Sequence, residues 1–184
     1  MKRRRFISYV IAPIALTALD EAARGQVRQY LTEDRALKLV FPRSQNIRSE
    51  NQSLSPVQRA SVERKLRYRL AAGTYRIYLG ETGDSVDGYA MIMNEVGKEE
   101  PITFIVGVTP EFRVSRIALM VFRESRGWEV EDARFTNQFR GKSAGDALQV
   151  GVDVVGVTGA TLSSRAFCKG AKKAVALCEA FYRK

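Results

Sequence analysis

The sequence predicts an α+β fold, in which helices pack on an antiparallel twisted sheet and the last helix follows a Gly-Ala-Thr turn. Between residues 74 and 121 the apolar side chains alternate with a period of two, which is typical of strands. Short turns connect these strands, and short connections favour antiparallel pairing because a parallel pair needs a crossover of about a dozen residues. Helical patterns flank the strands, which favours an α+β fold over a doubly wound one.

The first 21 residues have the pattern of a signal-like or membrane-anchoring segment. Basic residues 2–5 precede the uncharged apolar run 6–19, and two acidic residues end this run. The run is short for a membrane span, which needs about 20 residues, but it suits the apolar core of a secretory signal. The arginines also loosely resemble a twin-arginine signal. We expect export, with the segment cleaved or kept as a short anchor. The alternative is a buried N-terminal helix of a cytosolic protein.

Residues 22–73 are predicted to form a helical N-terminal region. The apolar residues of 22–40 keep helical spacing up to the break at Phe41-Pro42. The polar stretch 43–55 is expected to be a surface loop. A capped helix is predicted to start at Ser55-Pro56 and to run to about Ala71.

Residues 74–184 are predicted to form the second domain. Strands are expected at 74–79, 88–96, 102–108 and 117–121. The C-terminal helix carries one apolar stripe, which is expected to pack across the sheet and consists of Phe167, Ala171, Ala174, Cys178 and Phe181.

Composition excludes several kinds of chemistry. The chain has no histidine, which excludes Ser-His-Asp and Cys-His catalysis, histidine-ligated haem and histidine zinc sites, and we expect no metal site. Cys168 and Cys178 are expected to be small buried hydrophobes rather than a disulfide. The net charge of +10 permits anionic partners. The export-like N-terminus and the lack of a basic stripe interleaved with aromatic residues argue against nucleic acid.

The turn before the last helix is the strongest candidate site. Gly159 and Ala160 allow a tight turn, which presents the hydroxyl of Thr161 just ahead of the helix. Ser163 or Ser164 is expected to cap the helix. Free N–H groups and the helix dipole favour a phosphate at such a place. A plain helix cap without a ligand is the alternative.

Two further motifs precede this turn. Residues 123–128 read Arg-Glu-Ser-Arg-Gly-Trp directly after the fourth strand, and residues 135–142 read Phe-Thr-Asn-Gln-Phe-Arg-Gly-Lys. With the small-Gly-Ala-Thr turn, this order resembles the FMN-binding domain of flavin-carrying subunits of bacterial Rnf complexes and of sodium-pumping NADH:quinone reductase. It is also similar to the flavin domain of some regulators of nitrous-oxide respiration. The resemblance covers about residues 75–184.

The resemblance implies an electron-transfer flavoprotein of the cell envelope, periplasmic or otherwise extracytoplasmic, that relays electrons between membrane or periplasmic partners. In the family, a flavin transferase that uses FAD and Mg²⁺ esterifies FMN to the threonine that corresponds to Thr161. The protein is then an electron carrier rather than a stand-alone enzyme, and no catalytic residue is expected. The other cofactor-binding residues that the resemblance implies are Thr158, Gly159, Ala160, Leu162, Ser163, Ser164, Glu124, Ser125, Gly127, Trp128 and Lys142.

Two departures from the family pattern leave an alternative open. Val155 stands where the family motif has an acid, and the nearest acid is Asp153. Ser125 and Arg126 stand where threonine and proline are usual. The alternative is a non-catalytic sensory or assembly module with the same fold and a noncovalent flavin, or none. Trp128 as a core residue and Lys142 as an exposed lysine are the corresponding alternatives for those two side chains.

Overall fold

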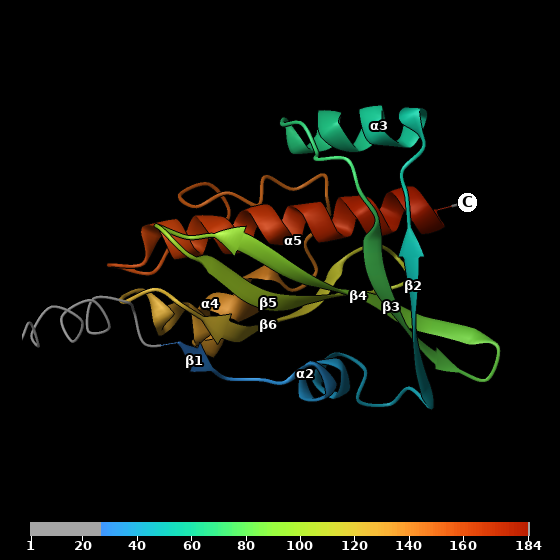
Figure 1. Cartoon of the computed structure of the whole chain (residues 1–184), viewed down its shortest axis with the longest axis horizontal. Coiled ribbons are helices and arrows are strands. Elements are labelled where there is room, and N and C mark those ends of the chain that lie inside the picture. Colours follow the sequence, from blue (N-terminus) through green and yellow to red (C-terminus); the bar gives the residue numbers. More distant parts are fainter. Residues whose placement is uncertain (1–26, 184) are drawn as a thin grey trace, which may run out of the picture.

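The computed structural model describes residues 27–183, so the predicted signal-like segment 1–21 lies outside the described residues. Within them the chain forms a six-stranded sheet with the order β1-β6-β5-β4-β3-β2 (Figure 1). All neighbouring strands pair antiparallel, as predicted. The strands are β1 (Arg28–Gln29), β2 (Asn46–Gln52), β3 (Tyr75–Thr82), β4 (Ser85–Val96), β5 (Pro101–Val108) and β6 (Val114–Phe122). The predicted α+β fold is therefore confirmed.

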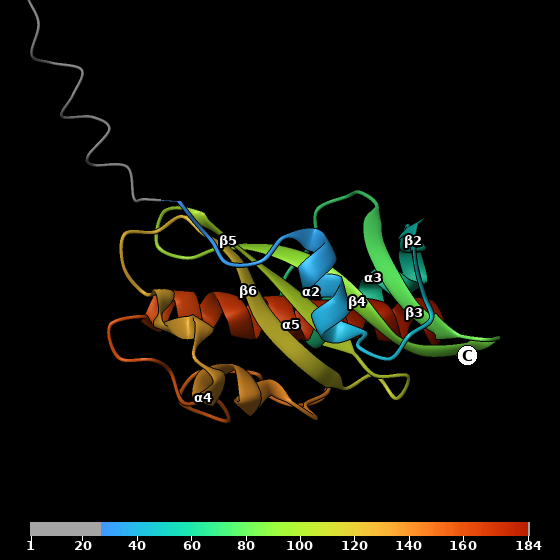
Figure 2. The same cartoon turned by 90° about the horizontal axis from the view of Figure 1, so that it is seen from below.

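Helices cover the two faces of this sheet unequally. The helices are α2 (Glu33–Val40), α3 (Pro56–Leu66), α4 (Ala133–Thr136) and α5 (Thr161–Tyr182), with 3₁₀ turns η1 (Trp128–Glu131) and η2 (Asn137–Phe139). The long α5 crosses one face and packs on β4 and β5, and α3 packs against α5. The short α2 lies on the other face, against β5 and β6 (Figure 2).

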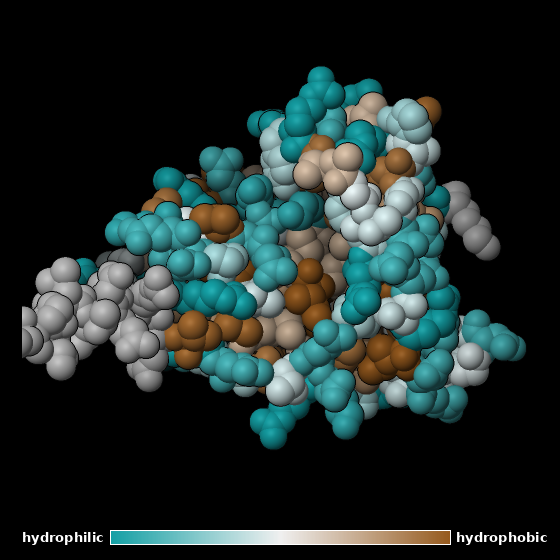
Figure 3. Space-filling model, in the orientation of Figure 1, coloured by the Kyte–Doolittle hydropathy of each residue, from teal (hydrophilic) through white to brown (hydrophobic). Residues whose placement is uncertain are grey.

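Strand alternation divides the core between these faces. Phe104 and Val106 of β5 point toward α5, whereas Ile105 between them joins the smaller cluster beneath α2. Phe104 stacks on Phe167 of α5 with ring centroids 4.2 Å apart. The predicted stripe of α5 lies in this core, and both cysteines are buried and free, as expected. On the face seen in Figure 3, hydrophobic side chains gather in a hollow below α3, with polar side chains around it.

Of the predicted helix over residues 22–40, Glu33–Val40 is confirmed as α2, whereas residues 27–32 are not helical. Arg28 and Gln29 pair with β6 instead. Thr32 caps α2, since its hydroxyl accepts a hydrogen bond from the N–H of Arg35 at 3.4 Å. The helical spacing of Val27, Tyr30 and Leu31 thus does not reflect a helix.

The predicted surface loop 43–55 is also wrong, because most of it is the edge strand β2. This strand pairs with β3 along its whole length. Its side chains are polar because an edge strand is largely solvated, and Arg48 reaches Glu81 of β3 at 2.7 Å. The N-terminal region, which we expected to consist of two helices and a surface loop, therefore supplies both edge strands of the sheet.

The capped start of α3 is confirmed, but its end lies earlier than predicted. Ser55 and Gln58 form a reciprocal capping box. The helix ends at Leu66 because Arg67 adopts a left-handed conformation, with φ of +63°, and its N–H bonds the carbonyl oxygen of Glu63. Gly73 therefore does not terminate this helix.

Candidate functional site

The N-terminus of α5 is open. We predicted that Ser163 or Ser164 caps it, and this is wrong: the cap position is Ala160, which supplies no side-chain hydrogen bond. The N–H of Ser164 donates to the carbonyl oxygen of Ala160 at 2.8 Å. The N–H groups of Thr161, Leu162 and Ser163 precede this first helical hydrogen bond. An anion at this end would meet free donors and the positive end of the helix dipole.

Ser164 holds the turn rather than capping the helix. Its hydroxyl donates to the carbonyl oxygen of Ala160 at 2.9 Å and accepts from the N–H of Val157 at 3.1 Å. Ser164 is fully buried. Gly159 has a φ of +79°, which favours glycine, and no atom lies within 4 Å of the position that a Cβ would take. Ser164 thereby fixes a turn on which Thr158, Gly159 and Thr161 are exposed.

The glutamate-containing turn after β6 lies against this helix start. Gly127 is buried with a φ of +96°, and a Cβ there would lie 2.7 Å from Oγ of Ser163. Both segments line a cavity of about 530 Å³. Its lining residues are Lys98, Glu124, Ser125, Arg126, Gly159, Ala160, Thr161, Leu162 and Ser163. The structure thus brings most of the predicted site residues together around Thr161.

Glu124 anchors a third segment at this cavity. Its Oε1 accepts hydrogen bonds from the backbone N–H groups of Lys98, Glu99 and Glu100, at 2.5, 2.8 and 3.1 Å. Glu124 is buried, so the turn between β4 and β5 is tied to the cavity wall. Lys98 and Arg126 then supply positive charge to the cavity lining. Sequence reasoning missed Lys98, because no sequence signal connects its turn to Glu124.

A second cavity, of about 710 Å³, lies beside the same threonine. Its lining runs through residues 150–159 and ends at Thr161. Val152 and Val155 of this lining are 66% and 75% exposed. Neighbouring exposed apolar side chains are typical of a surface that a ligand or another protein covers. Thr161 is therefore flanked by one cavity with cationic side chains and one with apolar side chains.

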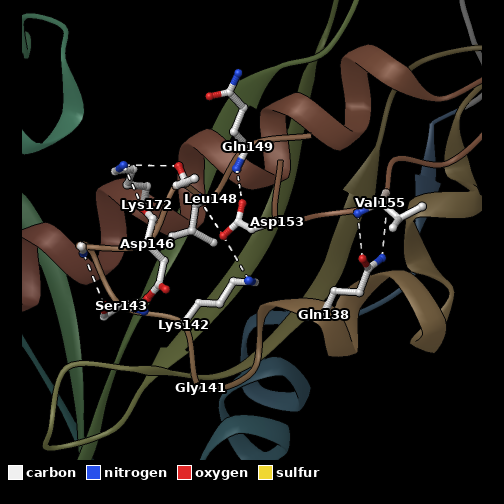
Figure 4. Close-up of polar contacts among 12 residues, drawn as sticks. Gln138, Gly141, Lys142, Ser143, Asp146, Leu148, Gln149, Asp153, Val155 and Lys172 are labelled. Carbon is white, nitrogen blue, oxygen red and sulfur yellow. Dashed lines mark hydrogen bonds and ion pairs between the residues drawn. The ribbon is translucent and has the colours of Figure 1, made fainter. Parts of the chain in front are cut away.

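Four of the predicted site residues line neither cavity: the buried Gly127 and Ser164, described above, and also Trp128 and Lys142. Trp128 packs partly buried against the core, and the guanidinium carbon of Arg28 lies 4.1 Å from the centroid of its ring. Nζ of Lys142 pairs with the carboxylate of Asp153 at 3.0 Å (Figure 4). Asp153 lines the second cavity, whereas Lys142 itself does not.

The loop that carries the second cavity is held by the contacts in Figure 4. The carboxylate of Asp153 accepts from the N–H groups of Gln149 and Leu148 at 2.8 and 3.1 Å, besides Lys142. The side-chain amide of Gln138 bonds both the N–H and the carbonyl oxygen of Val155, at 2.8 and 3.1 Å. The backbone of Val155 is therefore fixed although its side chain is exposed.

These contacts predict an acid-sensitive loop. Burial works to raise the pKa of Asp153, but the N–H of Gln149, the ammonium of Lys142 and the N–H of Leu148 outweigh it and hold the pKa below its usual range. A carboxylate whose pKa is lower in the folded than in the unfolded state stabilises the folded protein at pH values above the unfolded pKa of about 3.9. This stabilisation is lost as the pH falls through the pKa of the folded state.

We expect thermal stability of the wild type to fall more steeply below about pH 4 than that of Asp153→Asn, which has no carboxylate to protonate there. At pH 7 the same variant should be the less stable protein. Melting temperatures from pH 2 to 7 measure both effects. Parallel profiles for the two proteins would contradict the assigned role of Asp153.

Known proteins resemble this chain in sequence and in fold. Residues 97–176 match the family model of the FMN-binding domain. A component of the proton-translocating ferredoxin:NAD(+) oxidoreductase complex of Clostridium ljungdahlii is 31% identical over 106 residues, which are 53% of this chain and 57% of that protein. The crystal structure of Shewanella oneidensis NqrC is similar in fold, with a TM-score of 0.53 at 14% identity, over 84% of this chain and 89% of that chain.

The predicted resemblance to the FMN-binding domain is therefore confirmed for residues 97–176. The sequence of this chain is similar to that of a subunit of the Clostridium complex, and its fold is similar to that of NqrC. The chain spans 57% of the length of the Clostridium relative that it matches. Within residues 27–183 no helix is both long enough and apolar enough to cross a membrane.

Proposed function

We propose that this protein carries FMN on Thr161, through a phosphoester of its side-chain oxygen, and relays electrons between redox partners. The observation that carries the proposal is the exposed hydroxyl of Thr161 at an open helix N-terminus between two cavities. The match of residues 97–176 to the FMN-binding domain supports it. In-gel fluorescence of the denatured protein tests it, because only covalently bound flavin survives denaturation.

The residues present fit such a cofactor. The free N–H groups of the first turn of α5 suit a phosphate on Thr161, and Lys98 and Arg126 add positive charge nearby. Cavities of about 530 and 710 Å³ lie in the range usual for cofactor sites. When bound, FMN supplies the redox chemistry, while this chain supplies binding, orientation and electrostatics. The positive charges of Lys98 and Arg126 stabilise negative charge on a group bound beside Thr161.

The attachment requires a separate flavin transferase, with FAD and Mg²⁺ as in the family. The side-chain oxygen of Thr161 attacks the phosphorus of the FMN half of FAD, the bond between the two phosphates breaks, and AMP leaves. The hydroxyl proton passes to solvent. Thr161 is exposed, so its hydroxyl is accessible to another protein.

The proposed location is the cell envelope, with the flavin-carrying domain exported or anchored through residues 1–21. Their basic and apolar pattern supports this location. The proposed partners are membrane or periplasmic electron-transfer proteins. The name of the Clostridium relative, which belongs to a ferredoxin:NAD(+) oxidoreductase complex, supports a role within a complex.

A second candidate function is a sensory or assembly module with a noncovalent flavin, or none. The observation that favours it is Val155, whose side chain is 75% exposed where the family motif has an acid. Because the side chain of Val155 is exposed, it contributes little to the stability of this loop, but it is accessible to a transferase. A colourless protein with an intact fold after co-expression with a transferase would favour this second function.

We expect Val155→Asp to increase the fraction of protein that a flavin transferase modifies, because it restores the family's acid on an accessible surface. Stability should change by less than about 0.5 kcal/mol, as is usual at exposed positions. Intact mass spectrometry after a limited reaction time measures the modified fraction. Val152→Asp is the matched control, since it adds the same charge to another exposed valine of the same cavity. An equal increase with both variants would contradict a specific role for position 155.

A further inference from the structure

A third cavity lies away from Thr161, between the end of α3, the loop 145–150 and α5. Its volume is about 640 Å³, which is ample for a small organic ligand. Leu66, Leu148 and Cys168 form an apolar part of the lining, and all three are buried. Cationic side chains also line it, and these are Arg67, Arg165, Lys169 and Lys172.

The charge of this cavity is predominantly positive. Asp146 is its one acidic lining residue within residues 27–183, and the carboxylate of Asp146 accepts from the N–H and hydroxyl of Ser143, both at 2.7 Å. Lys172 donates to the carbonyl oxygens of Asp146 and Ala147. In the described part of the chain, Arg67 and Arg165 form no ion pair or side-chain hydrogen bond. Two guanidinium groups are therefore available to an anion.

Tyr68 also lines this cavity, but not through its hydroxyl group. Its hydroxyl is buried and has no hydrogen-bond partner within the described chain. An atom with almost no accessible surface cannot contact a ligand in a cavity that is open to solvent, so this hydroxyl is not a donor to such a ligand. Burial and the nearby carboxylate of Glu95 raise the pKa of Tyr68, so the hydroxyl stays protonated. Lys169 lies 5.2 Å from the centroid of its ring and bonds Glu95 at 2.9 Å.

The backbone around the cavity is also unusual. Leu148 has a φ angle of +45° and lines the cavity, whereas the φ of +63° at Arg67 belongs to the end of α3. Left-handed backbone at residues other than glycine is uncommon and tends to cluster where ligands bind. The left-handed backbone of Leu148 places its side chain in the buried, apolar part of the cavity lining.

We propose that the cavity between α3, the loop 145–150 and α5 binds a phosphate-bearing molecule, with Arg67 and Arg165 on the phosphate and the apolar lining under the rest of the ligand. Guanidinium groups match the geometry of phosphate oxygens, and they bind them through charge-assisted hydrogen bonds. This site is separate from Thr161 and does not depend on a bound flavin.

The same phosphate chemistry occurs in free metabolites and in lipid head groups, so two probes are needed. The full chain, expressed without a flavin transferase, is titrated with glycerol 3-phosphate and with dihexanoyl-phosphatidylglycerol. Dihexanoyl-phosphatidylcholine is the zwitterionic control. Amide NMR signals locate each probe, because residues 145–149 report on this cavity and residues 159–163 on the α5 N-terminus. Tighter binding of the first probe identifies a free phosphate compound as the ligand, and tighter binding of the second identifies a lipid.

We expect at least one anionic probe to shift the signals of residues 145–149 with saturation. Arg165→Gln and Arg67→Gln should each weaken this binding about tenfold, because each removes one charge-assisted contact to the phosphate. Arg43→Gln removes an exposed charge elsewhere and should leave the affinity within about twofold. Shifts confined to residues 159–163, no binding of either probe, or an equal loss in Arg43→Gln would each overturn the proposal.

Discussion

Replacing Thr161 with alanine should abolish covalent flavin incorporation when the full chain is co-expressed with a flavin transferase. The proposed ester needs a hydroxyl at this position, and the neighbouring hydroxyls are not equivalent. Ser164 is fully buried and already bonded to Ala160 and Val157. Ser163 is 4% exposed. Intact mass spectrometry should therefore show the FMN-sized increase in the wild type and its loss in Thr161→Ala, with in-gel fluorescence lost in parallel.

Two variants make this test specific. Thr158→Ala removes another exposed threonine hydroxyl from the same turn and should leave the modification unchanged. Thr161→Ser keeps a hydroxyl at this position, so at least part of the covalent modification should remain. Since Thr161 is exposed, its replacement should cost less than about 0.5 kcal/mol of stability, so unfolding would not explain a loss. A mass increase that persists in Thr161→Ala would exclude the proposed attachment residue.

The strands of the sheet centre could be predicted because their signal is local. In β5, alternate side chains such as Phe104 and Val106 share one face, and the α5 stripe repeats with helical spacing. The edge strand β2 carries no such signal. Its polar residues pair because β3 offers a free edge, as in the contact between Arg48 and Glu81. That pairing is a tertiary effect, which overrides a sequence typical of a loop.

The same distinction applies to the candidate site. The motifs around Glu124 and Thr161 were recognised from the order of residues, and the structure brings them to one cavity. The cap was misassigned because a serine side chain can bond backward as well as forward. Ser164 bonds the carbonyl oxygen four residues before it and leaves the helix start open. Lys98 could not be predicted, because its position depends on how Glu124 binds the β4–β5 turn.

Gly170, in the middle of α5, should not tolerate a larger residue, even though glycine is a poor helix former. Exchange of a helical glycine for alanine usually gains about 1 kcal/mol. Here a Cβ would lie 2.4 Å from Cζ and 2.9 Å from Cε2 of Phe104. The ring of Phe104 is fully buried and stacked on Phe167, so it has little room to move. Overpacking of a close-packed core costs about 1–3 kcal/mol, which exceeds the gain in helix propensity.

We therefore expect Gly170→Ala to lower the free energy of unfolding by about 1–2 kcal/mol, and Gly170→Val, with two more methyl groups, by about 3 kcal/mol or more. The latter corresponds to a fall in melting temperature of roughly 6–12 °C for a chain of this size. Thermal unfolding of the full chain measures both.

A double-mutant cycle separates this clash from other effects. Phe104→Leu alone should destabilise the protein by leaving a cavity beside α5. Combined with Gly170→Ala, it provides space for the new methyl group, so the double variant should be more stable than the sum of the two single effects predicts, by about 1 kcal/mol or more. Simple additivity would mean that the glycine is not required by the Phe104 ring. It would then have to be explained by the neighbouring Glu95, whose Cγ lies 3.2 Å from the same Cβ position.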